Sequence, residues 1–292
     1  MRLGWLMLVM LDKPEPRPGR LRRLLLRRKM RMPRDMMKRW FTRRPRLTVD
    51  TAEVPAGIRV YAIGDIHGRV DLLRRLHGHI IEDSASEPPG THNVAVYVGD
   101  YVDRGLHSRD VIDLLLDQPL PGFESIHLRG NHDHEFVAFL EDPVKSAAWL
   151  RYGGDATLYS YGVRVPSASP PEDRVMLLRD QLRDALPPRH LAFLNDLPFT
   201  YEVGDFLFVH AGIDPDKPLD WQTAADMLWI RERFLEADAD FGKIVVHGHS
   251  ISDSPDVREN RIGIDTGACY TNVLTSLVLE GRTKRFLSTA AS

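Results

Sequence analysis

Five apolar segments of the sequence each end on a glycine that stands beside aspartate, asparagine or histidine. These endings are Gly64-Asp65-Ile66-His67, Gly99-Asp100-Tyr101-Val102-Asp103-Arg104, Arg129-Gly130-Asn131-His132-Asp133, His210-Ala211-Gly212 and His247-Gly248-His249. In open α/β sheets, ligands gather beyond the carboxyl ends of the strands. Glycine at these points lets the backbone turn sharply and leaves room for a ligand. The repeated pattern therefore predicts an α/β fold with one polar site built from several strand ends.

The rest of the chain alternates short apolar runs with helical patterns from about residue 45 onward, as in an α/β domain. The expected strands span 58–63, 94–98, 123–128, 206–209, 243–246, 261–265 and 273–279. The expected helices span 69–82, 107–117, 132–141, 172–185, 189–195 and 223–235. Residues 142–205 interrupt the alternation and predict a small helical cap inserted into a domain of residues 45–292.

The first 44 residues differ in charge from this domain. Residues 1–46 carry 16 Lys/Arg and 3 Asp/Glu, a net charge of +13, whereas the remainder carries 23 and 38, a net charge of −15. The apolar start MRLGWLMLVML is shorter than the roughly 20 residues that span a bilayer. The basic run RLRRLLLRRKMRM fits an anionic membrane surface or nucleic acid. The favoured alternative is a disordered leader, or a translation start assigned upstream of the true one.

The single cysteine, Cys269, restricts the covalent chemistry of the chain. It excludes an internal disulfide and a cysteine-based zinc cluster, and we expect a small buried residue in a reducing, cytoplasmic compartment. It does not stand in a Cys-x₅-Arg phosphate loop, which excludes a cysteine phosphatase. Neither a Walker loop nor a dinucleotide fingerprint occurs, so the sequence does not independently indicate nucleotide binding.

The side chains at the strand ends have the chemistry of metal ligands. Carboxylate, amide oxygen and imidazole together suit hard or borderline divalent ions such as Mn²⁺, Fe²⁺ or Zn²⁺. Six such groups exceed the needs of one tetrahedral ion, so we expect two ions, a pair suited to in-line displacement at phosphorus. Asp100, central in chain order, is the natural carboxylate to bridge them.

These motifs resemble those of the calcineurin-like metallophosphoesterases, and the Asp103-Arg104-Gly105 ending resembles the phosphoprotein-phosphatase branch. The segment WLRYGGDATLYSYG is more similar to the bacterial serine/threonine protein phosphatase-like members than to the diadenosine tetraphosphatases. The resemblance covers about residues 45–288. It implies a four-layer α-β-β-α sandwich with a small helical cap.

The resemblance also implies a role for each matching residue. Asp65 and His67 hold one metal, Asp100 bridges, and Asn131, His210 and His249 hold the other. His132 donates a proton to the leaving group and is oriented by Asp103. The residues that clamp the phosphate are Arg104, Arg129 and Arg231, with Arg233 as the alternative to Arg231.

The expected activity is metal-dependent hydrolysis of phosphoserine and phosphothreonine in proteins, by direct attack of a hydroxide that bridges the two metals. The expected ions are Mn²⁺, with Fe or Zn as alternatives. The second hypothesis is symmetrical hydrolysis of diadenosine tetraphosphate with release of ADP, and the third is a non-catalytic scaffold.

Four further histidines and one carboxylate are not expected to take part directly. His77 and His79 are expected at the surface of a helix, and His127 is expected to be structural. His247 is expected behind the metal ligands, and Asp133 has no assigned catalytic role.

Overall fold

The computed structural model describes residues 46–85, 90–164 and 171–290. Arg46–Ser292 form one compact unit. The predicted basic segment 1–44, with its expected membrane or nucleic-acid contacts, lies outside the described residues. Among the helices of the described ranges, none is long and apolar enough to cross a bilayer.

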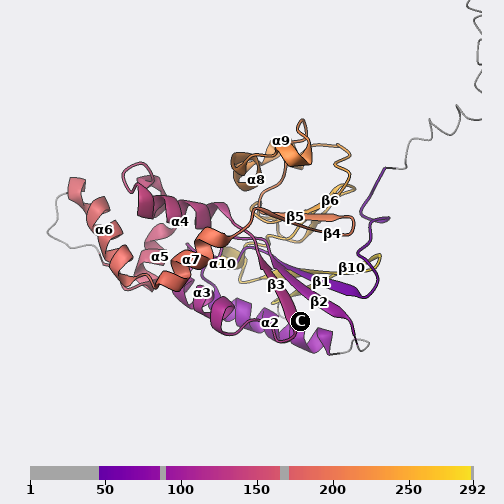
Figure 1. Cartoon of the computed structure of the whole chain (residues 1–292), viewed down its shortest axis with the longest axis horizontal. Helices are drawn as coiled ribbons and strands as arrows, with labels where there is room; N and C mark the ends of the chain where they lie inside the picture. The colour runs from indigo at the N-terminus through magenta and orange to yellow at the C-terminus, as the bar shows by residue number, and fades with distance from the viewer. Residues whose placement is uncertain (1–45, 86–89, 165–170, 291–292) are drawn as a thin grey trace, which may run out of the picture. The chain divides into compact units, whose positions relative to one another are not determined.

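The first sheet has five strands in the order β10-β9-β1-β2-β3 (Figure 1). Their bounds are β1 Ile58–Ile63, β2 His92–Tyr97, β3 Phe123–His127, β9 Thr275–Glu280 and β10 Thr283–Ser288. Strands β1, β2 and β3 are parallel, while β9 pairs antiparallel with β1 and with β10. The carboxyl ends of β1, β2 and β3 therefore meet at one edge of the sheet.

The second sheet also has five strands, in the order β4-β5-β6-β8-β7. Their bounds are β4 Thr200–Val203, β5 Phe206–Val209, β6 Ile244–His247, β7 Asp256–Val257 and β8 Arg261–Gly263. Strand β5 runs parallel to β6, and β6 parallel to β8. As in the first sheet, the ends of its central strands share an edge.

A core of aliphatic and aromatic side chains lies between the two sheets. Val60 and Ala62 of β1 belong to the same buried cluster as Phe208 of β5 and Val246 of β6. Tyr61 and Ile63 belong to a different cluster, which includes helices. Successive residues of a strand point to opposite faces, so β1 is covered on both sides, as its continuous apolar sequence predicts.

Helices cover the outer face of the first sheet. These are α2 Val70–Ser84, α3 Ser108–Asp117 and α4 Asn131–Glu141. In α2 the apolar residues Leu72, Leu73, Leu76 and Ile80 are buried at spacings of one helical face.

The insertion between α4 and β4 extends this same helical layer. It contains the short helices η1 Ala147–Tyr152 and α5 Gly154–Ser160, followed by α6 Pro171–Ala185 and α7 Pro188–Asp196. Trp149 and Leu158 are buried in the cluster that also contains residues of α2 and α4. The predicted range 142–205 differs at its end, because Thr200–Val203 form β4 of the second sheet.

The outer face of the second sheet carries the fourth layer. Leu207 of β5 and Val245 of β6 pack with Phe234. The expected single helix over 223–235 is wrong. The structure has α8 Ala224–Trp229 and α9 Glu232–Leu235, with Arg231 between them in a non-helical conformation. Helices, sheet, sheet and helices thus form the expected four layers.

Two further expectations need correction. His77 is 6% exposed, not at the surface, because it turns toward the first sheet, where Tyr97 Oη lies 2.8 Å from its Nε2 atom. Strands β4, β7 and β10 and the short helices η1, η2 Leu219–Trp221, α5 and α10 Ala268–Thr271 were not predicted. They are short or carry polar residues, so their periodicity is weak.

Candidate metal centre

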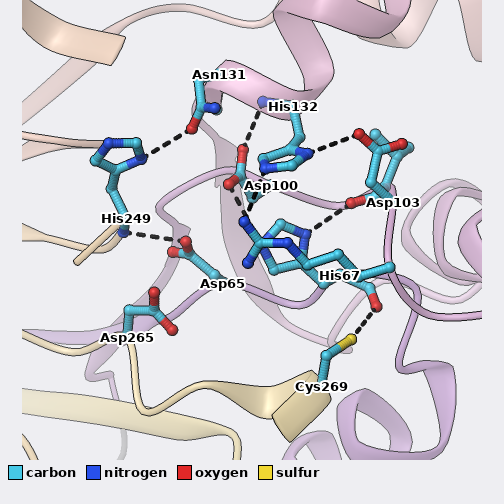
Figure 2. A network of polar contacts seen from close by, with 12 residues as sticks. Asp65, His67, Asp100, Asp103, Asn131, His132, His249, Asp265 and Cys269 are labelled. Atoms are coloured by element: carbon cyan, nitrogen blue, oxygen red, sulfur yellow. Dashed lines mark hydrogen bonds and ion pairs between the residues drawn. The ribbon is translucent and has the colours of Figure 1, made fainter. Parts of the chain in front are cut away.

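The edges of the two sheets bring the predicted strand endings together. Asp65 and His67 follow β1, Asp100 follows β2, and Asn131 begins α4 after β3. His210 follows β5 and His249 follows β6, both in the second sheet. Figure 2 shows Asp65, His67, Asp100, Asn131 and His249 facing a common centre. The chain therefore gathers all six predicted ligands, which are separated by up to 184 positions in sequence.

Asp100 stands between two groups of potential ligands. One group is His67, Asp100 and His132, the other Asp100, His210 and His249, and within each the ligand atoms lie within 4.8 Å of one another. Oδ2 of Asp100 is 3.5 Å from Nε2 of His67 and 3.4 Å from Nε2 of His210. A single carboxylate oxygen thus faces both groups, as the position of a bridging ligand requires.

The hydrogen-bond pattern of the imidazoles leaves lone pairs aimed at the centre. Nδ1 of His67 donates to the Val102 carbonyl at 2.8 Å, and Nδ1 of His210 donates to the Val98 carbonyl at 3.0 Å. With Nδ1 protonated in a neutral ring, Nε2 is an acceptor. Backbone carbonyls orient metal-binding histidines in this way.

Several of the atoms that face the centre have no hydrogen-bond partner in the protein. Such atoms show whether the site fits a cation. Oδ1 of Asp65 and Nε2 of His67 are buried without a hydrogen bond. Oδ1 of Asn131 lies 2.8 Å from Nε2 of His210 and 2.9 Å from Nδ1 of His249. When Nδ1 of His210 carries the proton, Nε2 of His210 and Oδ1 of Asn131 are both acceptors. The contact between them is then not a hydrogen bond. Converging lone pairs of this kind fit divalent cations.

The protonation states of the histidines and of Asp100 agree with metal binding. Burial foremost, with Asp265 and Asp100, raises the pKa of Asp65 well above its ordinary value, so this carboxyl needs a cation beside it to be ionised. Burial lowers the pKa of His67 to about 3 and that of His249 to about 2, and it also lowers the pKa of His210. Burial raises the pKa of Asp100, but the facing imidazoles, His210 foremost, more than offset this and hold it below its ordinary value. Neutral imidazoles and an ionised carboxylate are the forms that bind metal.

A fourth histidine stands beside these ligands in a different setting. Nδ1 of His132 donates to Oδ2 of Asp103 at 2.7 Å, and Arg104 Nη2 lies 3.0 Å from Nε2 of His132. Because arginine only donates, Nε2 accepts in this arrangement. Burial lowers the pKa of His132, but Asp100 and Asp103 outweigh burial and raise it. A histidine held by a carboxylate, with Nε2 directed to the cluster, is suited to proton donation.

The predicted phosphate-binding arginines occupy different positions. Arg104 contacts His132, and Arg231 Nη1 lies 3.4 Å from the His249 carbonyl, so both stand at the cluster. Arg129 instead donates to the carbonyls of Leu194 and Asn195 of α7. The structure does not bring Arg129 into hydrogen-bond contact with the cluster.

Arg233, the alternative to Arg231, is paired with Asp214 and Asp216. His247, the alternative to His249, packs against Phe234 with ring centroids 5.2 Å apart, and its Nδ1 contacts the Gly248 carbonyl. The geometry therefore favours Arg231 and His249 as the residues that face the cluster.

Two further carboxylates stand at the site: Asp133, to which sequence reasoning assigned no catalytic role, and Asp265, which it missed. Asp133 accepts from the backbone N–H groups of Gly130, Asp100 and Tyr101, so it fixes the turn that presents Asp100. Asp265 lies next to Asp65 (Figure 2), and burial foremost raises its pKa to about 6. The signal for Asp265 was present in Ile264-Asp265-Thr266-Gly267, another apolar strand that ends on aspartate beside glycine.

Cys269 is half-buried, and its Sγ donates to the His67 carbonyl at 2.9 Å. Burial raises the pKa of this thiol to about 11. The cysteine therefore supports the backbone of a ligand residue in its protonated form.

Asp, Asn and His side chains stand at the shared edge of the two sheets, and one carboxylate is common to two ligand groups. This arrangement fits the class of metal-dependent hydrolases with two divalent ions. The model of the calcineurin-like phosphoesterases matches residues 58–271, so the chain belongs to this family. Members of the family use two divalent ions, and the chain is a metallophosphoesterase-type hydrolase.

Similar proteins include the serine/threonine-protein phosphatase BSL2 of Arabidopsis thaliana, which is 35% identical over 86 residues. The match covers 28% of this chain and only 8% of the plant protein. A crystal structure of a candidate diadenosine tetraphosphatase has a TM-score of 0.53 at 20% identity and covers 80% of this chain and 95% of that one.

A cold-active protein tyrosine phosphatase has a TM-score of 0.51 at 19% identity, with 82% and 83% of the two chains covered. At these identities the two structures establish the fold alone.

Proposed function

We propose that the chain is a phosphomonoesterase that removes phosphate from phosphoserine and phosphothreonine in proteins, with two divalent ions, Mn²⁺ foremost and Fe or Zn as alternatives. Asp65, His67 and Asp100 hold one ion, and Asp100, Asn131, His210 and His249 hold the other. Supporting this assignment, Asp65 Oδ1 and His67 Nε2 are buried without partners. When bound, the ions supply Lewis-acid stabilisation of the phosphoryl oxygens and lower the pKa of the attacking water.

The protein residues perform three further tasks in this mechanism. Arg104 and Arg231 bind the phosphoryl oxygens, where charge-assisted contacts are strongest. Once the phosphoryl group engages Arg104, Nε2 of His132 is free to face the leaving oxygen. Nε2 accepts from Arg104 in the free protein and takes up a proton from solvent once that contact is released. As water oxygen joins phosphorus and the bond to the leaving oxygen breaks, this proton passes to the leaving oxygen, and the attacking water gives a proton to solvent. Asp103 stabilises the imidazolium before the transfer.

The observation that carries the choice of substrate is the buried Asp103–His132 pair, with its hydrogen bond of 2.7 Å. A serine or threonine alkoxide is a strongly basic leaving group and gains most from a proton donor. ADP is a much weaker base and gains less. The pair therefore favours an alkyl phosphomonoester, and the similarity to a serine/threonine-protein phosphatase points the same way.

The second candidate is symmetrical cleavage of diadenosine tetraphosphate, the activity for which a structural neighbour of the same fold is named. The net charge of −15 after residue 46 does not favour a polyanionic substrate by long-range attraction. The expected cytoplasmic location stays a prediction.

The test uses the full chain with Mn²⁺. It compares three substrates at equal concentration: a phosphoserine/phosphothreonine peptide, a phosphotyrosine peptide and diadenosine tetraphosphate. Release of phosphate from the phosphoserine/phosphothreonine peptide at the highest kcat/KM is the expected result. Asp100→Asn should be nearly inactive, because it removes the charge shared by the two ion positions, whereas the exposed Asp196→Asn should be fully active. Dominant release of ADP would establish the second candidate, and preference for phosphotyrosine would contradict both.

A further inference from the structure

The side chain of Asp103 is held by the insertion as well as by His132. The carboxylate is fully buried and accepts three hydrogen bonds of 2.7 Å. One comes from His132 Nδ1, one from Trp149 Nε1 in η1 and one from Thr157 Oγ1 in α5. Two of the three donors to the residue that orients His132 therefore belong to the insertion.

The backbone of Asp103 is fixed by the same segment. Its N–H group donates to Thr157 Oγ1 at 2.8 Å and to Ser108 Oγ at 3.1 Å. Because the Thr157 hydroxyl gives its one hydrogen to Asp103 Oδ1, the Ser108 hydroxyl donates in their mutual contact of 3.0 Å. Asp103 has a φ of 75°, a conformation that costs a non-glycine residue energy and needs such support.

The two consecutive glycines of the insertion are explained by this docking. A Cβ atom on Gly153 would lie 2.7 Å from the backbone nitrogen of Arg104, and one on Gly154 would lie 2.4 Å from the indole of Trp149. The Gly153 carbonyl also accepts from Arg104 N–H at 3.1 Å. The stretch from Trp149 to Thr157 is thus shaped to lie against Asp103 and Arg104.

Trp149 is itself held rigidly. It is 2% exposed and packs against Phe139 and Phe136 at ring-centroid distances of 4.8 and 5.6 Å. A rigid indole fixes the direction of its N–H group. The insertion therefore defines the orientation of the Asp103 carboxylate rather than adapting to it.

We propose that Trp149 and Thr157 are positioning residues that set the orientation of the Asp103–His132 pair, and with it the protonation of the leaving oxygen. This inference rests on the proposed function, in which His132 donates that proton. It makes the insertion part of the catalytic apparatus in addition to any contact it makes with substrate.

The first test compares two esters in the full chain with Mn²⁺. A phosphoserine peptide needs proton donation, whereas 4-nitrophenyl phosphate releases a weakly basic phenolate and needs it far less. Thr157→Val and Trp149→Phe remove one donor to Asp103 each. Thr157→Val keeps the size of the side chain, and Trp149→Phe keeps an aromatic ring in the core. Thr157→Ser retains the hydroxyl. Tyr161→Phe is the matched control, because it removes another buried hydrogen bond of the insertion, to His190, without touching Asp103.

For Thr157→Val and Trp149→Phe we expect kcat on the phosphoserine peptide to fall about 10- to 100-fold. KM and the 4-nitrophenyl rate should change less than about threefold, because substrate binding is kept. Thr157→Ser and Tyr161→Phe should resemble the wild type. In a His132→Ala background, Thr157→Val should have no further effect on the ratio of the two esters. Equal losses on both esters, or none on either, would overturn the proposal.

The second test does not depend on activity. In the metal-free full chain, the Nδ1 proton of His132, buried against Asp103, should give a slowly exchanging downfield NMR resonance that His132→Gln removes. We expect Thr157→Val and Trp149→Phe to speed its exchange with water at least about tenfold, and Thr157→Ser to preserve it. Unchanged exchange in both variants would refute the positioning role. If the wild type hydrolysed neither ester, the proposed function would fail, and this comparison would still decide whether the insertion orients His132.

Discussion

Strained backbone conformations gather at the metal centre. Among the described residues, the non-glycine residues with positive φ are His67, Asp100, Asp103, Arg104, His249 and Asn272. The first five carry or adjoin the chemistry. A left-handed conformation costs an L-residue about 1–2 kcal/mol, and the hydrogen bonds of Asp133 and of the insertion hold these turns in place. The site therefore depends on neighbours that do not touch substrate.

Gly153 gives a prediction at the scale of a single residue. Gly153 and Gly162 have φ values of +110° and +78°, but only at Gly153 would a Cβ atom meet another residue, while at Gly162 it meets nothing within 4 Å. Gly162→Ala should therefore cost about 1 kcal/mol from backbone strain alone. Gly153→Ala should cost about 3 kcal/mol, because the backbone of Arg104 must also move. Urea unfolding of both variants measures the difference, and equal costs would show that the docking is not tight.

The residues of the site differ in how well sequence reveals them. Each ligand follows an apolar run, so strand ends identify it without knowledge of the fold. Trp149 and Thr157 lie 46 and 54 positions from Asp103, and only tertiary packing joins them. His77 has the helical spacing of the buried Leu73 and Ile80, but as a polar residue it was expected outside. Its partner, the Tyr97 hydroxyl, lies on a strand 20 positions away.

At the scale of elements, α2 is attached to the first sheet by this polar contact as well as by leucines. His77 is buried against Tyr97, and the Tyr97 ring stacks on His127 at a centroid distance of 4.7 Å. Burial lowers the pKa of His77 to about 4. The folded chain therefore binds a proton at this position less readily than the unfolded chain, whose histidine titrates near 6.5.

This difference predicts a fall in stability with pH. Between pH 6.5 and 4 the unfolded state takes up the proton while the folded state does not, so the stabilisation present above pH 6.5 is lost as pH falls through this window. His77 accounts for about 3 kcal/mol of that loss. We measure the free energy of unfolding of the metal-free chain in urea as a function of pH. In His77→Gln, its fall between pH 6.5 and 4 should be smaller by this amount. Tyr97→Phe, which keeps the titrating group, should lower stability but retain the slope. An unchanged profile in His77→Gln would contradict the assignment.

Elements with strong periodicity were predictable, and those with weak periodicity were not. The predicted strand at 58–63 and helix at 107–117 match β1 and α3 within a residue. The expected helix over 223–235 failed because the periodic pattern continues through Ile230 and Arg231, where the chain turns. That turn places Arg231 beside the His249 carbonyl. Local sequence carries no sign of it, because neither glycine nor proline stands beside Ile230 and Arg231.

At the scale of the molecule, the centre joins the two sheets. Asp65, His67 and Asp100 come from the first sheet, whereas His210 and His249 come from the second. Ions bound there hold the sheets together in the folded state and have no equivalent site in the unfolded chain. Metal binding must therefore contribute to the stability of the whole fold.

Removal of metal should accordingly lower the unfolding temperature of the Mn²⁺-loaded full chain. At an ion concentration 100 times the dissociation constant, binding contributes about 2.7 kcal/mol, which corresponds to a shift of roughly 5–10 °C for a chain of this size. Calorimetry before and after addition of a chelator measures the shift. Asp100→Asn should show a much smaller one. An equal response of Asp100→Asn and the wild type would place the bound ions elsewhere.

The strand order of the first sheet also sets the order in which the site and its supporting sheet are completed during synthesis. β1 is the first of the described strands in chain order, yet one of its two neighbours in the sheet is β9, the ninth. His210 and His249 both precede β9 in the chain, so every proposed ligand is translated before this neighbour of β1. The proposed ligands are therefore translated first, and the strand that completes the sheet beside β1 is translated after them.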